Sequence, residues 1–554
     1  MLNKHHSRLL YILQSNNKKN ICSAAFSMFL LLLICVLPSC SQMDDSEVGY
    51  DAELINQHLT ADVTFEEKYR PQYHYSPKIN WMNDPNGLVY HQGTWHLYHQ
   101  YNPFGTRWGY MSWNHATSTD LIHWEHRPVA IPYGQDEEEG IFSGSAVVDH
   151  TNSSGFGDGN GAPIVAVYTS AYGGEEPYQA QSLAYSTDGG ITFTKYEGNP
   201  VLTFEDPNFR DPNVKWDAVN ERWLMVVALP LQHKVQFYAS DNLIDWEYLS
   251  DFGPAGATGG IWECPDLFPL AVDGDPDRIK WVLHVDMNPG AIAGGSGSQF
   301  FVGDWDGTRF TADPEFSEED VIWADYGTDY YAAISWNNVP EDDGRRIMIG
   351  WMNNWDYANE IPTSPWRSAM SLPRTVELNE KNGKVWIIQQ PVAELEQLRS
   401  GTSRIGRVSL NSNIEDAEIS GKSYELLMEI DPGNSTLAGI KVRSGNGEET
   451  IIGYDSSTET VYADRSISGD VTFHESFVRT SRAPARLIDG KVRLRIFVDW
   501  SSVEIFINDG ESVITKRIFP EPESTGIRFF ADGGEAKFTN IEFHEIKSIW
   551  DNQP

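Results

Sequence analysis

Cysteine and basic residues are scarce in this chain of 554 residues. There are four cysteines, Cys22, Cys35, Cys40 and Cys264, and the first two lie inside an N-terminal apolar run, so no disulfide framework is expected. Lys and Arg number 41 against 79 Asp and Glu, which gives a net charge of −38. A surface this acidic repels phosphate backbones, so a nucleic-acid partner is not expected.

Helical periodicity is also rare beyond residue 70. Short runs rich in Val, Ile, Tyr, Trp and Phe alternate with Gly, Asp, Asn and Pro clusters, as in 94–101, 162–169 and 222–229. This alternation predicts an all-β protein. The chain also holds 19 Trp, which fits a carbohydrate-binding protein, although most single Trp side chains serve as core.

A weak repeat divides the first part of this region. An acidic turn precedes an aromatic residue four times, at Trp124, Phe193, Trp246 and Phe310. The spacings between these four aromatic residues are typical of four-stranded propeller blades. About five such blades would fill residues 70–385. Chance recurrence of a turn and an aromatic residue is the alternative.

The composition changes near residues 375–400. Residues 387–399 have apolar side chains at helical spacing and predict a short connector, placed at 386–400. Beyond it, residues 492–510 predict two strands around Asp499–Ser502 and a turn at Asn508-Asp509-Gly510. Residues 401–548 therefore predict a β-sandwich with a mainly structural role.

The N-terminus has the pattern of an export signal. Residues 21–37 are uncharged and follow Lys18-Lys19, and Leu37-Pro38-Ser39-Cys40 resembles the bacterial lipoprotein box. We expect a signal peptide over 1–39, a lipidated Cys40, and an acidic tether over 40–69. Removing the first 39 residues would bring the net charge from −38 to −42, because they carry four basic side chains and no acidic one. A retained signal anchor is the alternative.

The acids just after Cys40 resemble a surface-export signal of some Gram-negative lipoproteins. We expect a protein anchored in the outer membrane through Cys40 alone and facing the cell exterior; a periplasmic location stays open. The sequence predicts no oligomeric state.

Three acidic residues stand in unusual surroundings. Asp84 lies in N-D-P-N-G (83–87), a combination expected to form a tight turn; Asp211 lies in F-R-D-P-N; and Glu263 lies between Trp262 and Cys264. The prolines after Asp84 and Asp211 favour an extended backbone at both acids.

The surroundings also predict different protonation states. An acid beside an indole and a thiol should be desolvated, which would raise the pKa of Glu263, while turn amides should keep Asp84 ionised. One protonated and one ionised carboxyl are what glycoside hydrolysis requires.

These three segments, in this order, resemble glycoside hydrolase family 32, the β-fructosidases. The resemblance runs from about residue 72 to 547 and includes H-Q-Y-N-P (99–103), 108–124, 141–149 and G-W-M-N-N-W-D-Y-A (350–358). It implies a five-bladed β-propeller followed by a β-sandwich, and a retaining enzyme that releases fructose from levan, inulin and sucrose.

The resemblance also implies roles for individual residues. Asp84 would be the nucleophile, Glu263 the general acid and base, and Asp211 the stabiliser of the transition state, with Cys264 tuning Glu263. The positions that would line the fructose pocket are Asn83, Gln100, Trp108, Phe142, Ser143, Arg210 and Trp355. Taken singly, Trp108 or Phe142 could be core, and Arg210 could belong to a structural ion pair.

No metal or cofactor is implied; the acid-rich segment 271–278 could hold calcium, but a solvated turn explains it better. Residues 354–368 look most like exo-acting bacterial fructosidases, so we expect exo action. An endo-levanase, a fructosyltransferase and a non-catalytic fructan-binding lipoprotein remain as alternatives.

Overall fold

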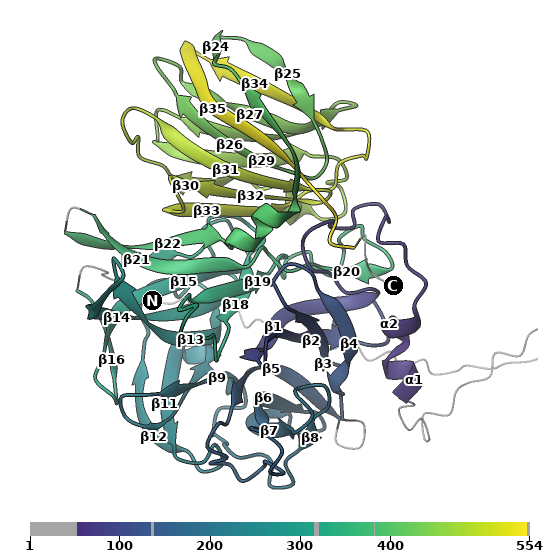
Figure 1. Ribbon diagram of the computed structural model, residues 1–554, viewed down its shortest axis with the longest axis vertical. Coiled ribbons are helices and arrows are strands. Elements are labelled where there is room, and N and C mark those ends of the chain that lie inside the picture. The colour runs from purple at the N-terminus through teal and green to yellow at the C-terminus, as the bar shows by residue number, and fades with distance from the viewer. Residues whose placement is uncertain (1–51, 135–137, 315–320, 382, 551–554) are drawn as a thin grey trace, which may run out of the picture. The chain divides into compact units, whose positions relative to one another are not determined.

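The computed structural model describes residues 52–134, 138–314, 321–381 and 383–550. The predicted signal peptide (1–39), Cys40 and the beginning of the tether lie outside these residues. Almost all regular structure in the described chain is β-strand, arranged as an N-terminal β-propeller and a C-terminal β-sandwich (Figure 1). The predicted fold class is therefore confirmed.

The propeller consists of five antiparallel four-stranded blades that follow one another along the chain. They are formed by β1 (Asn80–His91), β2 (Thr94–Asn102), β3 (Ser112–Ser118) and β4 (Glu125–Ile131); β5 (Glu139–Val148), β6 (Ile164–Tyr172), β7 (Tyr178–Ser186) and β8 (Thr194–Lys195); β9 (Arg210–Asp217), β10 (Arg222–Leu229), β11 (Lys234–Ser240) and β12 (Glu247–Phe252); β13 (Ile261–Val272), β14 (Asp275–Asn288), β15 (Gly297–Trp305) and β16 (Phe310–Ala312); and β18 (Tyr331–Ser335), β19 (Ile347–Trp351), β21 (Arg374–Lys381) and β22 (Lys384–Pro391).

The sequence repeat marks the same place in four of these blades. Trp124, Phe193 and Trp246 each directly precede the fourth strand of a blade, and Phe310 begins one. The acidic turn with its aromatic residue is therefore the corner at which the chain enters the outer strand. The hypothesis of chance recurrence is not needed.

The first strands of the five blades form a closed ring. β1 neighbours β5, β5 neighbours β9, β9 neighbours β13, β13 neighbours β18, and β18 neighbours β1. Two short strands complete the propeller: β20 (Trp366–Arg367) pairs in parallel with β1, and β17 (Ile322–Trp323) pairs with β15. Because the ring closes, side chains from segments far apart in the sequence meet at its axis.

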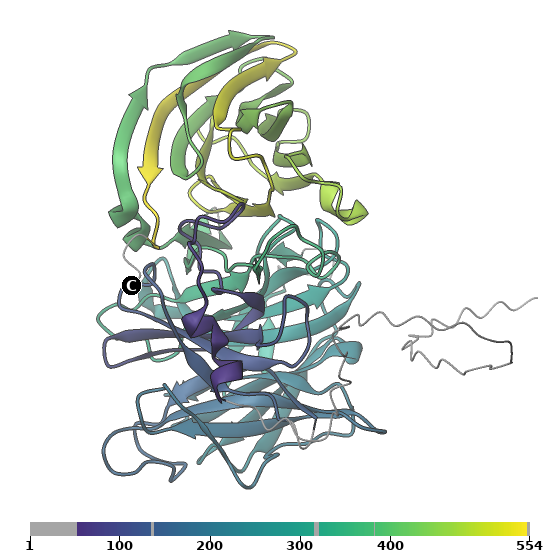
Figure 2. The same ribbon diagram turned by 90° about the vertical axis from the view of Figure 1, so that its right-hand side faces the viewer.

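The sandwich has two antiparallel sheets that lie face to face (Figure 2). One contains β23 (Arg399–Ile405), β24 (Val408–Asn411), β26 (Tyr424–Asp431), β31 (Val492–Asp499), β32 (Ser502–Ile507), β33 (Ser512–Arg517) and β35 (Glu535–Ile546); the other contains β25 (Ile414–Ser420), β27 (Leu437–Gly445), β28 (Glu448–Asp455), β29 (Thr460–Ile467), β30 (Ser481–Pro484) and β34 (Gly526–Asp532).

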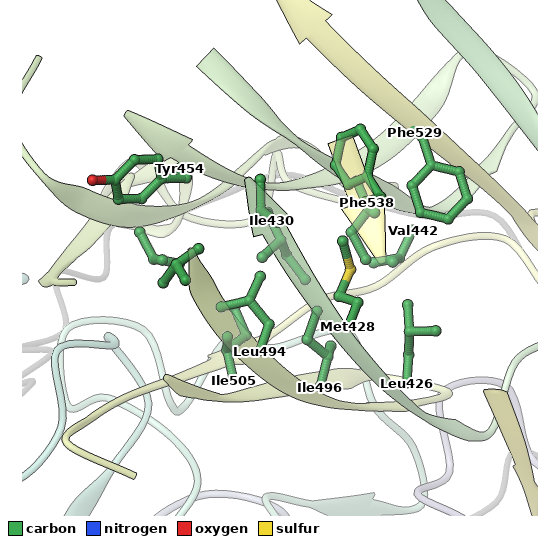
Figure 3. Packing of buried hydrophobic residues seen from close by; sticks show 14 of the residues in the cluster. Leu426, Met428, Ile430, Val442, Tyr454, Leu494, Ile496, Ile505, Phe529 and Phe538 are labelled. Carbon is green, nitrogen blue, oxygen red and sulfur yellow. The ribbon is translucent and has the colours of Figure 1, made fainter. Parts of the chain in front are cut away.

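Alternate residues of both sheets point into one apolar core. Figure 3 shows Leu426, Ile430 and Leu494 of the first sheet packed near Val442 and Phe529 of the second, all almost fully buried. The strands predicted over 492–510 are confirmed as β31 and β32.

Two predicted connecting segments differ from expectation. The first half of 387–399 belongs to strand β22, because it pairs along β21, and only η2 (Ala393–Leu398) is helical, as a 3₁₀ turn. In the described part of the predicted tether, helices α1 (Ala52–Ile55) and α2 (Gln57–Thr60) pack on the first blade; His58 is buried and its Nε2 lies 2.9 Å from the Arg127 carbonyl oxygen. Residues 52–69 are thus part of the folded unit. The other 3₁₀ helices in the described part of the chain are η1 (Pro230–Gln232) and η3 (Glu475–Val478).

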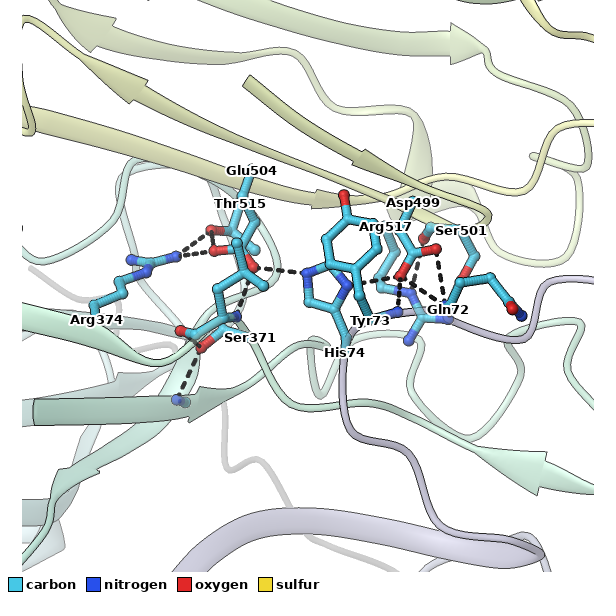
Figure 4. Close-up of polar contacts among 12 residues, drawn as sticks. Gln72, Tyr73, His74, Ser371, Arg374, Asp499, Ser501, Glu504, Thr515 and Arg517 are labelled. Carbon is cyan, nitrogen blue, oxygen red and sulfur yellow. Dashed lines mark hydrogen bonds and ion pairs between the residues drawn. The ribbon is translucent and has the colours of Figure 1, made fainter. Parts of the chain in front are cut away.

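A buried ionic network joins the propeller to the sandwich (Figure 4). His74 Nδ1 lies 2.8 Å from Asp499 Oδ2, and its Nε2 lies 3.0 Å from Glu504 Oε1. Arg374 donates to Glu504 at 2.6 Å and to Asp325 at 3.0 Å. Removing one member would leave the others charged and without water, which costs more than the network contributes.

His74 makes this network sensitive to pH. Burial alone would lower the pKa of His74, but its contacts with the Asp499 and Glu504 carboxylates outweigh burial and raise it. A raised pKa in the folded state means that the stabilisation is complete below the unfolded value of about 6.5 and is lost as the pH rises through the folded value.

We predict that H74Q lowers the free energy of unfolding by about 3 kcal/mol at pH 6 and that its deficit relative to the wild type shrinks towards pH 9. Thermal unfolding of both proteins from pH 6 to 9 measures this. H123Q is the control, since His123 faces Asp120 in a half-exposed pair and should change little. A deficit that stays constant with pH would contradict the prediction.

Candidate active site

The inner strand of each blade carries one irregularity at the same level of the propeller. Two successive residues of the inner strand oppose a single residue of the second strand, which is the pattern of a β-bulge. The bulged pairs are Asn83 and Asp84 in β1, Phe142 and Ser143 in β5, Asp211 and Pro212 in β9, Cys264 and Pro265 in β13, and Ala332 and Ala333 in β18. The predicted nucleophile, the predicted stabiliser and Cys264 are therefore bulge residues, and Glu263 directly precedes a bulge.

Three of these bulges hold the backbone in the left-handed region. The φ angles are 64° for Asp211, 45° for Cys264 and 53° for Ala332. Non-glycine residues rarely adopt such angles, which cost about 1–3 kcal/mol each and occur at functional sites. The extended backbone predicted for Asp211 from its following proline is therefore wrong: Pro212 shares the bulge with it, where a missing N–H costs no ladder hydrogen bond.

Asp84 is held by its own strand and by the next blade. Asn83 Nδ2 donates to its Oδ1 at 3.0 Å, and Ser143 Oγ donates to its Oδ2 at 2.6 Å. The predicted tight turn is wrong, because residues 80–91 form the single strand β1 with bulges before Pro85 and after Asn86. Gly87 takes the second bulge at a φ of 54°, where a Cβ would meet the Tyr98 ring at 2.7 Å.

Cys264 links Asp84 to Asp211. Its Sγ lies 3.7 Å from Asp84 Oδ2 and 3.8 Å from Asp211 Oδ2, and its backbone N–H donates to Asp211 Oδ2 at 3.1 Å. Burial, together with the surrounding carboxylates, raises the pKa of the Cys264 thiol well above its usual value. The thiol therefore stays protonated and is a weak donor to both acids.

Glu263 has different neighbours from those expected. Arg210 Nη2 donates to its Oε1 at 2.8 Å, and the Tyr331 hydroxyl donates to its Oε2. Trp262 points to the other face of the strand, where its Nε1 donates to the Ala257 carbonyl oxygen. The predicted contact between Cys264 and Glu263 is thus replaced by contacts of Cys264 with the two aspartates, because successive strand residues face opposite ways and the bulge turns Cys264 separately.

Both aspartates are buried, and burial dominates their acidity. It raises the pKa of Asp84, although the hydrogen bonds from Ser143 and Asn83 oppose this. It raises the pKa of Asp211 to about 7; the positive charge of Arg210 opposes the increase, and the negative charges of Glu263 and Asp84 add to it. The expectation that turn amides surround Asp84 is therefore wrong, since side chains of Ser143 and Asn83 donate to it and burial opposes its ionisation.

Most of the predicted pocket residues lie around these acids. Asn83, Ser143 and Arg210 contact them directly, as described above. Trp355 stacks on Trp81 with ring centroids 5.9 Å apart, and Trp108, which is 46% exposed, meets the edge of Phe142 at 5.8 Å. Gln100 differs: it lies opposite the Asn83–Asp84 bulge, and its Nε2 donates to the Ile141 carbonyl oxygen at 2.9 Å, so it joins the first two blades.

Two residues of the site were not predicted. Tyr331, on the inner strand of the fifth blade, donates to Glu263, and Thr169 Oγ1 accepts the Asp211 N–H at 2.9 Å. The position of Tyr331 just before the β18 bulge matches that of Glu263 just before the β13 bulge. An alignment of the five inner strand sequences would have shown that Tyr331 occupies the same position in its blade as Glu263 does.

Within the described residues, no group of three or more His, Cys, Asp or Glu side chains is arranged to hold a metal ion. The acid-rich segment 271–278 consists of the end of β13, a two-residue turn and the start of β14, and Arg278 lies 3.7 Å from Asp273. No helix of the described chain is both long enough and apolar enough to span a bilayer.

Because its pKa is raised, Asp211 destabilises the folded protein once the pH is high enough to ionise it. The unfolded chain ionises this carboxyl near pH 4 while the folded chain does so near 7, so the wild type loses stability as the pH rises through that window. We predict that D211N raises Tm by a few degrees at pH 8 and has no such effect at pH 4.

D266N is the matched control for this prediction. Asp266 is equally buried in β13, but Lys215 Nζ lies 3.0 Å away, and together with other partners it lowers the pKa of Asp266 despite burial. D266N should therefore lower Tm at pH 8. Equal shifts for D211N at both pH values would contradict the prediction.

Comparison with known proteins agrees with this architecture. The chain is 48% identical to the levanase of Bacillus subtilis over 517 residues, covering 90% of this chain and 74% of that protein. It is 42% identical to the extracellular exo-inulinase of Aspergillus ficuum, covering 88% and 96%. The crystal structure of exo-inulinase from Aspergillus awamori superposes with a TM-score of 0.82 at 38% identity, covering 88% of this chain and all of that one.

The family descriptions divide the chain in the same two parts. The N-terminal domain of glycosyl hydrolases family 32 matches residues 74–391, and the C-terminal domain of that family matches residues 394–545. The ring of five bulged strands with its buried carboxyls lies in the first match. The chain belongs to glycosyl hydrolase family 32.

Proposed function

We propose that this glycoside hydrolase is a β-fructosidase that releases fructose from fructans by a retaining mechanism. The observation that carries the proposal is the meeting of Asp84, Asp211 and Glu263 at one end of the propeller axis, within a set of contacts made through Cys264 and Arg210. The named relatives, a levanase and exo-inulinases, support fructan as the substrate class.

In the first half-reaction, Asp84 attacks the anomeric C2 of a terminal fructosyl unit. Glu263 transfers its proton to the glycosidic oxygen as the C2–O bond breaks, so the leaving sugar departs as an alcohol and a fructosyl ester of Asp84 remains. Ser143 and Asn83 donate to the two oxygens of Asp84, which stabilises its anionic form before the attack.

In the second half-reaction, Glu263 takes a proton from water, and the resulting hydroxide attacks C2. The ester bond breaks, Asp84 leaves as a carboxylate, and fructose is released with its configuration retained. This mechanism requires the Asp84 and Glu263 carboxyls to lie about 5–5.5 Å apart, which remains a prediction.

Asp211 is assigned to the sugar hydroxyls. A carboxyl with a pKa near 7 can donate one hydrogen bond and accept others, which suits neighbouring hydroxyl groups as the ring gains oxocarbenium character. The aromatic rings of Trp355, Phe142 and Trp108 provide an apolar wall for the fructose ring, and Arg210 orients Glu263.

We favour exo action. The support is the similarity of residues 354–368 to exo-acting fructosidases and the exo-inulinases among the relatives. An endo-levanase has the same acids but an open groove, and a fructosyltransferase differs only in the acceptor of the second step. A non-catalytic fructan-binding protein would have no need for two buried aspartates, one of them with a left-handed backbone.

Product analysis on levan, inulin and sucrose tests the proposal. We expect fructose alone from the first minutes, because an exo enzyme removes one terminal unit per encounter. A ladder of oligosaccharides would indicate an endo-levanase, and longer oligomers at high sucrose would indicate a transferase. Fructan binding without any release of reducing sugar would overturn the enzyme proposal.

E263Q supplies the mechanistic control for the same assay. We expect kcat/KM to fall by about 10²–10⁴, because the amide can neither donate nor accept the required proton. With a fructoside whose leaving group needs no acid, E263Q should accumulate a fructosyl ester on the peptide containing Asp84, detectable by mass spectrometry. Unchanged hydrolysis by E263Q would rule out its assigned role.

We also propose that the enzyme is exported and anchored in the outer membrane by lipids on Cys40, facing the cell exterior. The apolar run before Cys40 and the extracellular relatives support export. Several acyl chains suffice for stable anchoring.

C40S should therefore lose the lipid label and leave the membrane fraction, while an active protein persists. Protection of the wild type from external protease would favour a periplasmic location.

A further inference from the structure

The residues just after the fifth blade's second strand connect the candidate pocket with the sandwich. Trp355 stacks on Trp81 and lies 4.9 Å from the Trp351 ring, in the same apolar cluster as Cys264. The next two residues, Asp356 and Tyr357, instead contact side chains of the sandwich. One wall of the pocket is therefore one peptide bond away from the other domain.

Tyr357 is held in a fully buried polar cluster. Its hydroxyl donates to Asp329 at 2.7 Å and accepts from Arg465 Nη2 at 2.8 Å, and Arg465 Nη1 donates to Asp329 at 2.6 Å. The Arg465 guanidinium also lies 3.7 Å from the centre of the Phe477 ring, which meets the edge of Tyr357. Buried charge pairs with this many contacts have one well-defined arrangement.

Asp356 is held by a second arginine of the sandwich. Arg479 Nη2 lies 2.8 Å from Asp356 Oδ2, and both side chains are about one-third exposed. The same guanidinium packs against Gly294, where a Cβ would lie 2.8 Å from its Nη1. Arg479 therefore contacts both the loop that follows Trp355 and the loop between β14 and β15.

These two loops are also tied to each other directly beside Trp355. The backbone N–H of Trp355 donates to Ser296 Oγ at 3.0 Å, and Asn354 Nδ2 donates to the Gly294 carbonyl oxygen at 3.2 Å. A Cβ on Gly295 would lie 2.2 Å from Asn354 Oδ1, so only glycine allows this approach. Arg479 thus packs against a pair of loops that together determine where the Trp355 ring lies.

We propose that Arg479 of the C-terminal sandwich is a positioning residue for the sugar-binding wall of the propeller, acting through Asp356 and the Gly294 loop on Trp355. The inference rests on the proposed β-fructosidase function and gives the sandwich a part in substrate affinity beyond support. A domain that only braced the propeller would need the His74 network but no contact to the residues adjoining Trp355.

R479Q tests the proposal, because it removes the charge at a partly exposed position and leaves the buried Arg465 cluster intact. We expect KM for inulin-type oligosaccharides to rise at least about threefold with kcat little changed. R482Q is the matched control: Arg482 Nη1 lies 3.1 Å from Asp455 in a similar exposed pair of the sandwich, and its loss should leave KM unchanged. Equal KM values for R479Q and the wild type would overturn the proposal.

A double-mutant cycle with W355A shows whether the effect passes through Trp355. If it does, R479Q has no further effect on KM in the W355A background; an equal effect in both backgrounds would refute the assigned path. Hydrogen exchange of residues 352–360 measures the effect of Arg479 on this loop without any catalytic reaction. The exchange rate should increase in R479Q but not in R482Q. Should the wild type release no fructose, the proposed function fails, while the exchange result still decides whether Arg479 orders this loop.

Discussion

The backbone of each inner propeller strand has to satisfy two demands at the same point. It must remain paired with the second strand of its blade, and it must turn side chains towards the axis at angles that a regular strand does not provide. A bulge meets both demands, because two residues share one partner and the following ladder is preserved. All five inner strands have one at this level, and the side chains of Asp84, Asp211 and Cys264 come from three of them. The candidate site therefore depends on the closure of the ring as much as on the acids.

The arrangement has a cost that the rest of the fold offsets. Asp84 and Asp211 are buried near Glu263. The Arg210 guanidinium forms ion pairs with Asp211 and Glu263. Burial and mutual repulsion keep Asp211 partly protonated near neutral pH, and left-handed backbone angles at Asp211 and Cys264 add strain. Such groups are tolerated where the surroundings determine the geometry completely. Here the surroundings are the extensive blade pairing and the tightly packed contacts between neighbouring blades.

The sandwich contributes to this rigidity at two places with different chemistry. The His74 network ties the N-terminal segment, the propeller and the sandwich together through charges that are almost fully buried. The contacts of Arg465 and Arg479 lie closer to the pocket, on the residues adjoining Trp355. The first joins the two domains alongside the apolar contacts between them, and the second holds one wall of the proposed pocket in place. A chain reduced to the propeller would lose both.

The sequence alone determined the fold class and named three acids that the structure brings together, because period-two alternation, recurring turns and three rare motifs are local signals. Its assignment of pocket residues by resemblance stays a prediction. It did not determine how those residues contact one another. The N-D-P-N-G segment has the composition of a turn but lies within one strand, and Cys264 neighbours Glu263 in the chain but contacts Asp84 and Asp211 in space. Bulges decide which way a side chain points, and they arise from pairing with distant strands. Only the tertiary structure could therefore show the true neighbours of Glu263, Arg210 and Tyr331, and the desolvation of Asp84 and Asp211.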